Sequence, residues 1–163
     1  MKRSLVATIC FALVLLSVAT VAPAKDPGGC RIHDVKGAWG YSETGTLYHP
    51  TLGAIPYASV GSYTIDPWGH LSGARTASAG GNIQFATVEG TATVDPDCTG
   101  TLMLSLYDAS NNLLNTVVKF VVYVDDAKGA RSIITDIVMP DGATHLKAVL
   151  VTDARKLFAD TSQ

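Results

Sequence analysis

The sequence predicts an all-β protein, an eight-stranded antiparallel up-and-down barrel. From Trp39 onward, stretches rich in Val, Ile, Thr, Tyr and Leu alternate with compact turn signals. No sustained apolar period of 3.6 residues, the mark of an amphipathic helix, runs through this part of the chain before Asp153. Of the 163 residues, 47% are hydrophobic and 16% are charged, which suits a packed core. An open two-sheet β-sandwich is the alternative.

Residues 1–24 are expected to be a cleavable signal peptide, and residues 25–163 a single barrel domain. The chain starts with Lys2 and Arg3, continues with an apolar run, and reaches Ala22-Pro23-Ala24, which suits a signal peptidase. The apolar run, about 17 residues, is short for a membrane anchor. We therefore expect a secreted or periplasmic protein of bacterial type, without membrane contact after cleavage.

Two cysteines remain after the leader is removed, because Cys10 lies inside it. An oxidising compartment favours one bridge between Cys30 and Cys98. Two unpaired thiols are the alternative.

Eight strands are expected, separated by turn signals that contain Gly, Pro, Asn or Asp. The strands are expected near residues 37–47, 56–66, 70–79, 83–94, 100–108, 113–125, 130–139 and 144–153. Short turns make neighbouring strands antiparallel, and closing the meander into a barrel removes its edges.

Two hairpin registers predict which residues share a face. A turn at 126–129 pairs Lys119 with Asp136, and a two-residue turn at 141–142 places Asp136 opposite Lys147. The resulting polar face, expected to meet water, carries Lys119, Tyr123, Asp136, His145 and Lys147. The opposite face, expected to line the interior, carries Val118, Phe120, Val122, Val124, Ile133, Ile137, Leu146, Ala148 and Leu150.

The reverse assignment stays open, because Val117, Val121 and Ile134 share the charged face. Two apolar faces suggest that the outside is partly covered, by a second subunit in a homo-oligomer or by the terminal segments. If the outside is a subunit interface, the polar row is internal.

Two stretches, 37–73 and Gly90–Thr101, resemble a group of secreted bacterial β-proteins without an assigned activity. The shared motifs are those of turns and strands, such as Trp39-Gly40-Tyr41 and Asp95-Pro96-Asp97-Cys98. More distantly, residues 63–72 and 88–91 are similar to the allene oxide cyclase barrel. That resemblance implies an eight-stranded barrel with an apolar lumen and leaves a trimer open. The cyclase activity is not carried over, because its catalytic positions do not match here residue by residue.

Aromatic side chains are concentrated in the first half of the chain. If these side chains line a barrel mouth, they would suit the binding of an apolar small molecule. The alternative is that they pack within the barrel as aromatic residues commonly do in strands. The candidate ligand-binding residues are Tyr41, Tyr57, Tyr63, Phe85 and Phe120.

The candidate catalytic residues are Glu89, Lys119, Asp136, His145 and Lys147. Placed inside a dry lumen they would support the acid-base chemistry of an isomerase or cyclase; placed outside they form a solvated row of charges. The four histidines lack metal-ligand spacing, and no cofactor fingerprint occurs, so neither a metal nor a cofactor is expected.

The formal net charge of −2, without a basic face, argues against nucleic-acid binding. Two function classes remain. One is a barrel that binds an apolar small molecule or acts as an interaction module, and the other is an isomerase or cyclase with its site in the lumen.

Overall fold

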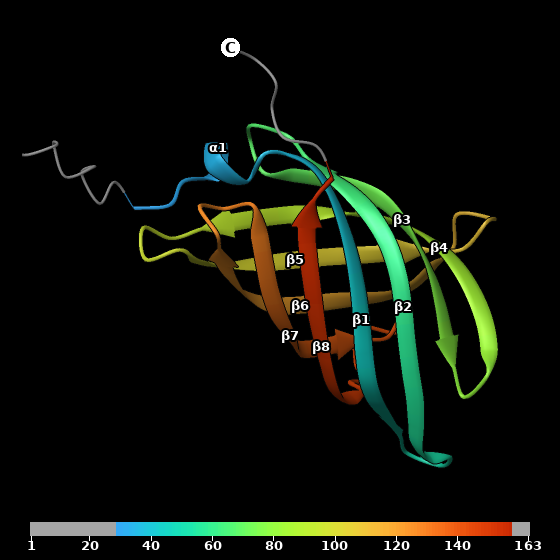
Figure 1. Ribbon diagram of the computed structural model, residues 1–163. Coiled ribbons are helices and arrows are strands. Elements are labelled where there is room, and N and C mark those ends of the chain that lie inside the picture. The colour runs from blue at the N-terminus through green and yellow to red at the C-terminus, as the bar shows by residue number, and fades with distance from the viewer. Residues whose placement is uncertain (1–28, 158–163) are drawn as a thin grey trace, which may run out of the picture.

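The computed structural model describes residues 29–157, and these form a closed barrel of eight strands in chain order (Figure 1). The predicted all-β, up-and-down barrel is therefore confirmed. The predicted signal peptide, residues 1–24, lies outside the described residues. The elements are α1 (Ile32–Val35), β1 (Gly37–His49), β2 (Gly53–Ile65), β3 (His70–Ala79), β4 (Asn82–Val94), β5 (Thr99–Tyr107), β6 (Leu113–Val124), β7 (Gly129–Val138) and β8 (Lys147–Lys156).

The barrel closes because β1 pairs antiparallel with both β2 and β8. All eight strands lie within three residues of their predicted ranges; the largest departures are β2, which begins three residues early at Gly53, and β8, which begins three residues late at Lys147. The preceding loop is longer than the predicted two-residue turn. Asp141 holds it, since Oδ1 accepts hydrogen bonds from the backbone of Ala143 (3.0 Å) and Thr144 (2.8 Å). Within the described residues, no helix is long and apolar enough to cross a bilayer.

One end of the barrel, which we call the closed end, is filled by side chains. Trp39 is fully buried there, and its Nε1–H donates to the carbonyl of Val35 in α1 at 2.8 Å. The rings of Tyr63 and Tyr123 pack against Trp39 at centroid distances of 6.4 and 6.3 Å. The helix and this aromatic group therefore plug the lumen.

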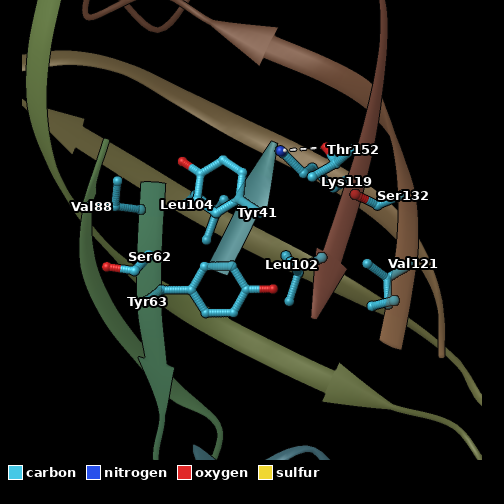
Figure 2. Close-up of a pocket in the computed structure, with 12 residues that line it drawn as sticks. Tyr41, Ser62, Tyr63, Val88, Leu102, Leu104, Lys119, Val121, Ser132 and Thr152 are labelled. Atoms are coloured by element: carbon cyan, nitrogen blue, oxygen red, sulfur yellow. Dashed lines mark hydrogen bonds between the residues drawn. The ribbon is translucent and has the colours of Figure 1, made fainter. Parts of the chain in front are cut away.

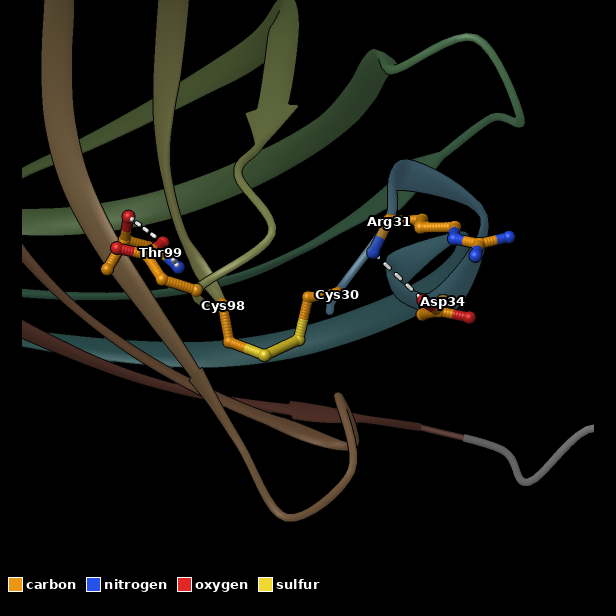
Figure 3. Close-up of a disulfide and its surroundings, with 6 residues drawn as sticks. Cys30, Arg31, Asp34, Cys98 and Thr99 are labelled. Carbon is orange, nitrogen blue, oxygen red and sulfur yellow. Dashed lines mark hydrogen bonds between the residues drawn. A yellow bond between two sulfur atoms is a disulfide. The ribbon is translucent and has the colours of Figure 1, made fainter. Parts of the chain in front are cut away.

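A disulfide between Cys30 and Cys98 ties the segment before α1 to the turn between β4 and β5 (Figure 3). The Cys30 backbone N–H also donates to the carbonyl of Pro96 at 3.2 Å. The predicted bridge is thus confirmed, and it is compatible with an extracellular or periplasmic location.

The opposite end, which we call the open end, carries the connections β1–β2, β3–β4, β5–β6 and β7–β8. Figure 1 shows the β1–β2 hairpin projecting away from α1 and from the end of β8. No element of the described chain crosses this end as α1 crosses the other.

A β-bulge in β7 changes which residues face inward. Lys119 pairs with Ile134, whereas the next residue back, Val118, pairs with Asp136, so Thr135 is the extra residue. An extra residue reverses the in-out alternation of the strand that carries it. Ser132 therefore faces inward before the bulge and Ile137 after it. The predicted pairing of Lys119 with Asp136 is wrong.

The bulge explains why each predicted face is half right. Phe120, predicted inside, is 43% exposed on the outer face, and its neighbour Lys119, predicted outside, is buried. Ile137 and Leu150 are buried as predicted. Val122 and Ile133 are also exposed rather than internal, Val118 and Val124 are only half-buried, and Tyr123 is internal rather than external.

Large apolar side chains lie on the outer surface of several strands. The exposed ones include Val60, Ile83, Phe85, Met103, Phe120, Ile133, Val149 and Val151. The predicted burial of this outer surface by a second copy of the chain stays a prediction.

Candidate functional site

Three polar side chains meet in the middle of the lumen, from β1, β6 and β8. Glu43 and Thr152 face each other across the β1–β8 pairing, and the Thr152 hydroxyl donates to Glu43 Oε2 at 2.7 Å. Lys119 Nζ donates to the same carboxylate oxygen and to the Thr152 hydroxyl, the latter at 3.0 Å. All three residues are at most 6% exposed. The group is a buried ion pair whose charges and hydrogen bonds are internally matched.

Burial shapes the electrostatics of this group. Desolvation lowers the pKa of Lys119, and the Glu43 carboxylate opposes that shift by stabilising the ammonium form. Lys119 Nζ lies 5.5 Å from the centre of the Tyr41 ring, a cation–π distance. Desolvation also raises the pKa of the Tyr41 phenol, which therefore stays protonated beyond the pH at which an exposed tyrosine ionises.

A second polar group lies nearer the open end. Arg75 from β3 donates from Nη1 to the Tyr57 hydroxyl of β2 at 2.7 Å. Its Nε is buried and has no hydrogen-bond partner, and the same holds for Asn115 Oδ1. Buried polar atoms without partners are uncommon in folded proteins, so this cluster has donors and acceptors to offer.

Three small cavities follow one another along the lumen and share lining residues. The inner cavity lies beside Lys119 and Tyr41, and leaves about 20 Å³ for the centres of water molecules (Figure 2). A second, about 10 Å³, lies between Lys119 and Arg75. Since one water needs about 10–15 Å³ by this measure, these two hold one or two waters and no larger molecule.

The third cavity, which we call the mouth cavity, lies toward the open end. By the same measure it leaves about 40 Å³, twice as much as the inner cavity. Leu47, Ile134 and Leu146 line it and are only partly buried, so it reaches the solvent side of the barrel. Its polar lining is Glu43, Tyr57, Arg75 and Asn115, and its apolar lining is Leu47, Val117, Ile134, Ile137, Leu146 and Leu150.

The predicted ligand-binding residues divide between the two sides of the barrel wall. Tyr41 and Tyr63 line the inner cavity, and Tyr57 lines the mouth cavity. Phe85 and Phe120 are 57% and 43% exposed on the outside and contact none of these three cavities. Phe85 was expected at a barrel mouth, but the alternation of β4 turns Ala86 and Val88 inward instead.

The predicted catalytic residues do not form one constellation. Only Lys119 lies in the lumen, whereas Glu89 and Lys147 are exposed outside. Asp136 and His145 meet on the outside, with His145 Nδ1 2.8 Å from Asp136 Oδ1. The bulge at Thr135 is the reason, because it separates the face of Asp136 from the face of Lys119.

Sequence reasoning missed Glu43, Arg75 and Thr152. A signal for the first two was present. Glu43 follows Trp39 and Tyr41 at alternate positions of one strand, and Arg75 stands between Leu71 and Ala77 in the same way. Alternation within a single strand locates such residues without any assumption about hairpin register.

Residues 29–157 contain no group of three His, Cys, Asp or Glu side chains able to hold a metal ion. Protein-family models and curated protein sequences give no match to this chain. The resemblances to secreted bacterial β-proteins and to allene oxide cyclase therefore stay predictions.

One solved structure, of EF1p2_mFAP2b bound to DFHBI, is similar to this chain in fold. The two share 10% sequence identity with a TM-score of 0.51, over 78% of this chain and 99% of the other. At this identity the likeness concerns the barrel fold alone.

Proposed function

We propose that this chain is an exported binding barrel that holds a small, mostly apolar molecule in its mouth cavity. The observation that carries the proposal is the asymmetry of the lumen. One end is plugged by Trp39 and α1, and the other contains a cavity with six apolar and four polar side chains. A mostly apolar lining with a few convergent polar groups is typical of small-molecule sites.

The fold is suited to this role. EF1p2_mFAP2b, a barrel of similar fold, has a solved structure in which it is bound to DFHBI, a small molecule. A barrel of this fold can therefore bind a small molecule. The Cys30–Cys98 disulfide supports export, because such bridges persist in oxidising compartments.

Two adjacent positions of β7 allow a matched test. Ile134 lines the mouth cavity, and Ile133 is 50% exposed on the outer face. Ile134→Trp fills the cavity, and Ile133→Trp adds the same bulk outside. We expect a neutral solvatochromic dye such as Nile red to bind the unaltered protein and the Ile133 variant, and to bind the Ile134 variant at least tenfold more weakly.

Binding is measured by dye fluorescence and by native mass spectrometry, with circular dichroism confirming that both variants are folded. Equal binding by the two variants, or no binding by the unaltered protein, would contradict the proposal.

The internal position of Lys119 is the observation that favours an isomerase or cyclase as the second candidate. Its pKa is lowered by burial, as acid-base catalysis requires. Against this, Nζ is already bonded to Glu43 and Thr152, and the adjoining inner cavity has half the volume of the mouth cavity. The binding role therefore has the stronger geometric support.

A further inference from the structure

We infer that the ligand of the mouth cavity is a carboxylate with an apolar body, and that Arg75 receives its negative charge. This inference rests on the proposed binding function and specifies its ligand class. Glu43, Lys119 and Arg75 are charged side chains that line the middle and outer cavities of the lumen. Glu43 and Lys119 neutralise each other in one ion pair, which leaves the Arg75 guanidinium as an uncompensated positive charge.

Arg75 has no acidic partner among the described residues. The polar and ring contacts of its side chain are both with Tyr57: Nη1 donates to the Tyr57 hydroxyl, and the guanidinium carbon lies 5.8 Å from the centre of the Tyr57 ring. No carboxylate of residues 29–157 forms an ion pair with it. The Arg75 side chain is partly buried and its Nε is fully enclosed, so water reaches only part of the guanidinium.

The hydrogen-bonding groups around Arg75 are also incomplete. Arg75 Nε is buried without an acceptor, although the guanidinium of arginine presents donors in a planar fork that fits two carboxylate oxygens. The Asn115 amide lines the same cavity, and its oxygen has no partner. A half-turn of that amide presents its NH₂ group to an anion. An anion here would satisfy atoms that are otherwise buried and unbonded.

The remaining walls set the character of the rest of the ligand. Leu47, Ile134 and Leu146 surround the outer part of the cavity, and Val117, Ile137 and Leu150 complete its apolar lining. A fully polar anion such as phosphate would leave this surface unmatched, and a neutral apolar molecule would leave Arg75 uncompensated. A carboxylate on a hydrocarbon chain matches both parts.

The inference is tested with decanoate, decanol and decylamine, which differ only in the head group. Titration calorimetry on the unaltered protein is expected to show decanoate binding at least tenfold more tightly than decanol, and decylamine binding more weakly than decanol. Arg75→Gln removes the charge and is expected to abolish the preference for decanoate. Arg131→Gln is the matched control, because the Arg131 side chain is 72% exposed on the outer face.

If Arg75→Gln does not fold, Arg75→Lys keeps the charge but removes the fork, and we expect it to retain part of the preference. Equal affinities for decanoate and decanol on the unaltered protein would overturn the inference, as would a full preference in Arg75→Gln. Either result, together with dye binding that the Ile134→Trp change removes, leaves the proposed binding function intact. Failure of decanoate, decanol and Nile red alike would instead refute the binding function.

Discussion

Lys119 of β6 reaches across the lumen to the carboxylate of Glu43 in β1, joining residues 76 positions apart in the sequence. Thr152 of β8 bonds to both partners, so the group links strands on both sides of the seam where the first and last strands pair. A buried ion pair adds little over a well-packed apolar pair, but removing one partner leaves a costly unpaired charge. The pair therefore favours the closed barrel over arrangements that would separate β6 from β1.

Replacing Lys119 with Met is expected to destabilise the protein by about 3–5 kcal/mol, because Glu43 is then left buried without its cation. Urea unfolding followed by circular dichroism measures the loss. The double variant Lys119→Met, Glu43→Leu should recover most of it, since neither charge remains. A single variant as stable as the unaltered protein would contradict this account of the pair.

Replacing Phe120 with Ala is expected to cost less than about 1.5 kcal/mol, well below the 3–5 kcal/mol typical of a buried aromatic side chain. Phe120 is the immediate neighbour of Lys119 but is 43% exposed on the outer face. Urea unfolding followed by circular dichroism at low protein concentration measures this loss of unfolding free energy. A loss of several kcal/mol that grows with protein concentration would instead show that a second subunit covers Phe120.

The two tryptophans should be separable by fluorescence. Trp39 is fully buried at the closed end, whereas Trp68 is 79% exposed. In the Trp68→Phe variant only Trp39 emits, and we expect its emission to be blue-shifted and poorly quenched by acrylamide. In the Trp39→Phe variant only Trp68 emits, and we expect its emission to be red-shifted and readily quenched. Efficient quenching of both variants would show that the closed end admits solvent.

Stability at alkaline pH should depend on Tyr123. Burial raises the pKa of its phenol to about 12, whereas tyrosine in an unfolded chain titrates near pH 10. Between these values the folded protein holds a proton that the unfolded chain releases, so the stabilising contribution is complete below pH 10 and is lost as pH rises toward 12.

Tyr123→Phe is therefore expected to make the decline in unfolding free energy between pH 10 and 12 shallower. At pH 7 it should cost nothing or stabilise slightly, because the buried Tyr123 hydroxyl has no hydrogen-bond partner. Tyr48→Phe, at a position 45% exposed, serves as the control. If the unfolding free energy declines equally steeply between pH 10 and 12 in all three proteins, the expectation is wrong.

Loss of the disulfide should destabilise the protein by up to about 4 kcal/mol on the chain-entropy estimate, because the bridge joins residues 68 positions apart. The double variant Cys30→Ser, Cys98→Ser is compared with the unaltered protein by thermal and urea unfolding. Free-thiol labelling of the unaltered protein is the control. Labelling of both Cys30 and Cys98 without reductant, located by peptide mass spectrometry, would show that the bridge does not form.

The barrel could be predicted from the sequence because its signals are local. Turn residues such as Gly80-Gly81 and alternating apolar residues repeat along the chain, and each strand pairs with its neighbour in sequence. The faces of the last three strands could not be assigned in the same way. Those faces depend on the registers of two successive hairpins, and the bulge at Thr135 places Lys119 and Asp136 on opposite faces.

The site was harder to predict for a related reason. Glu43 and Lys119 belong to strands far apart in the sequence, and a closed barrel brings them together through its interior and not through a shared hairpin. No pairwise register between neighbouring strands shows such a contact. Arg75 alternates with small and apolar residues, so its strand alone could have indicated an internal charge.

The described chain enters and leaves the barrel at the same pole. β1 starts beside α1, and after β8 the backbone N–H of Leu157 donates to the carbonyl of Ala38 at 2.9 Å (Figure 1). The mouth cavity opens at the other pole, where the hairpins lie. A tether, affinity tag or fused domain joined to either end of residues 29–157 therefore attaches opposite the mouth. The protein can be immobilised on a sensor surface in this way with its opening directed toward the solution.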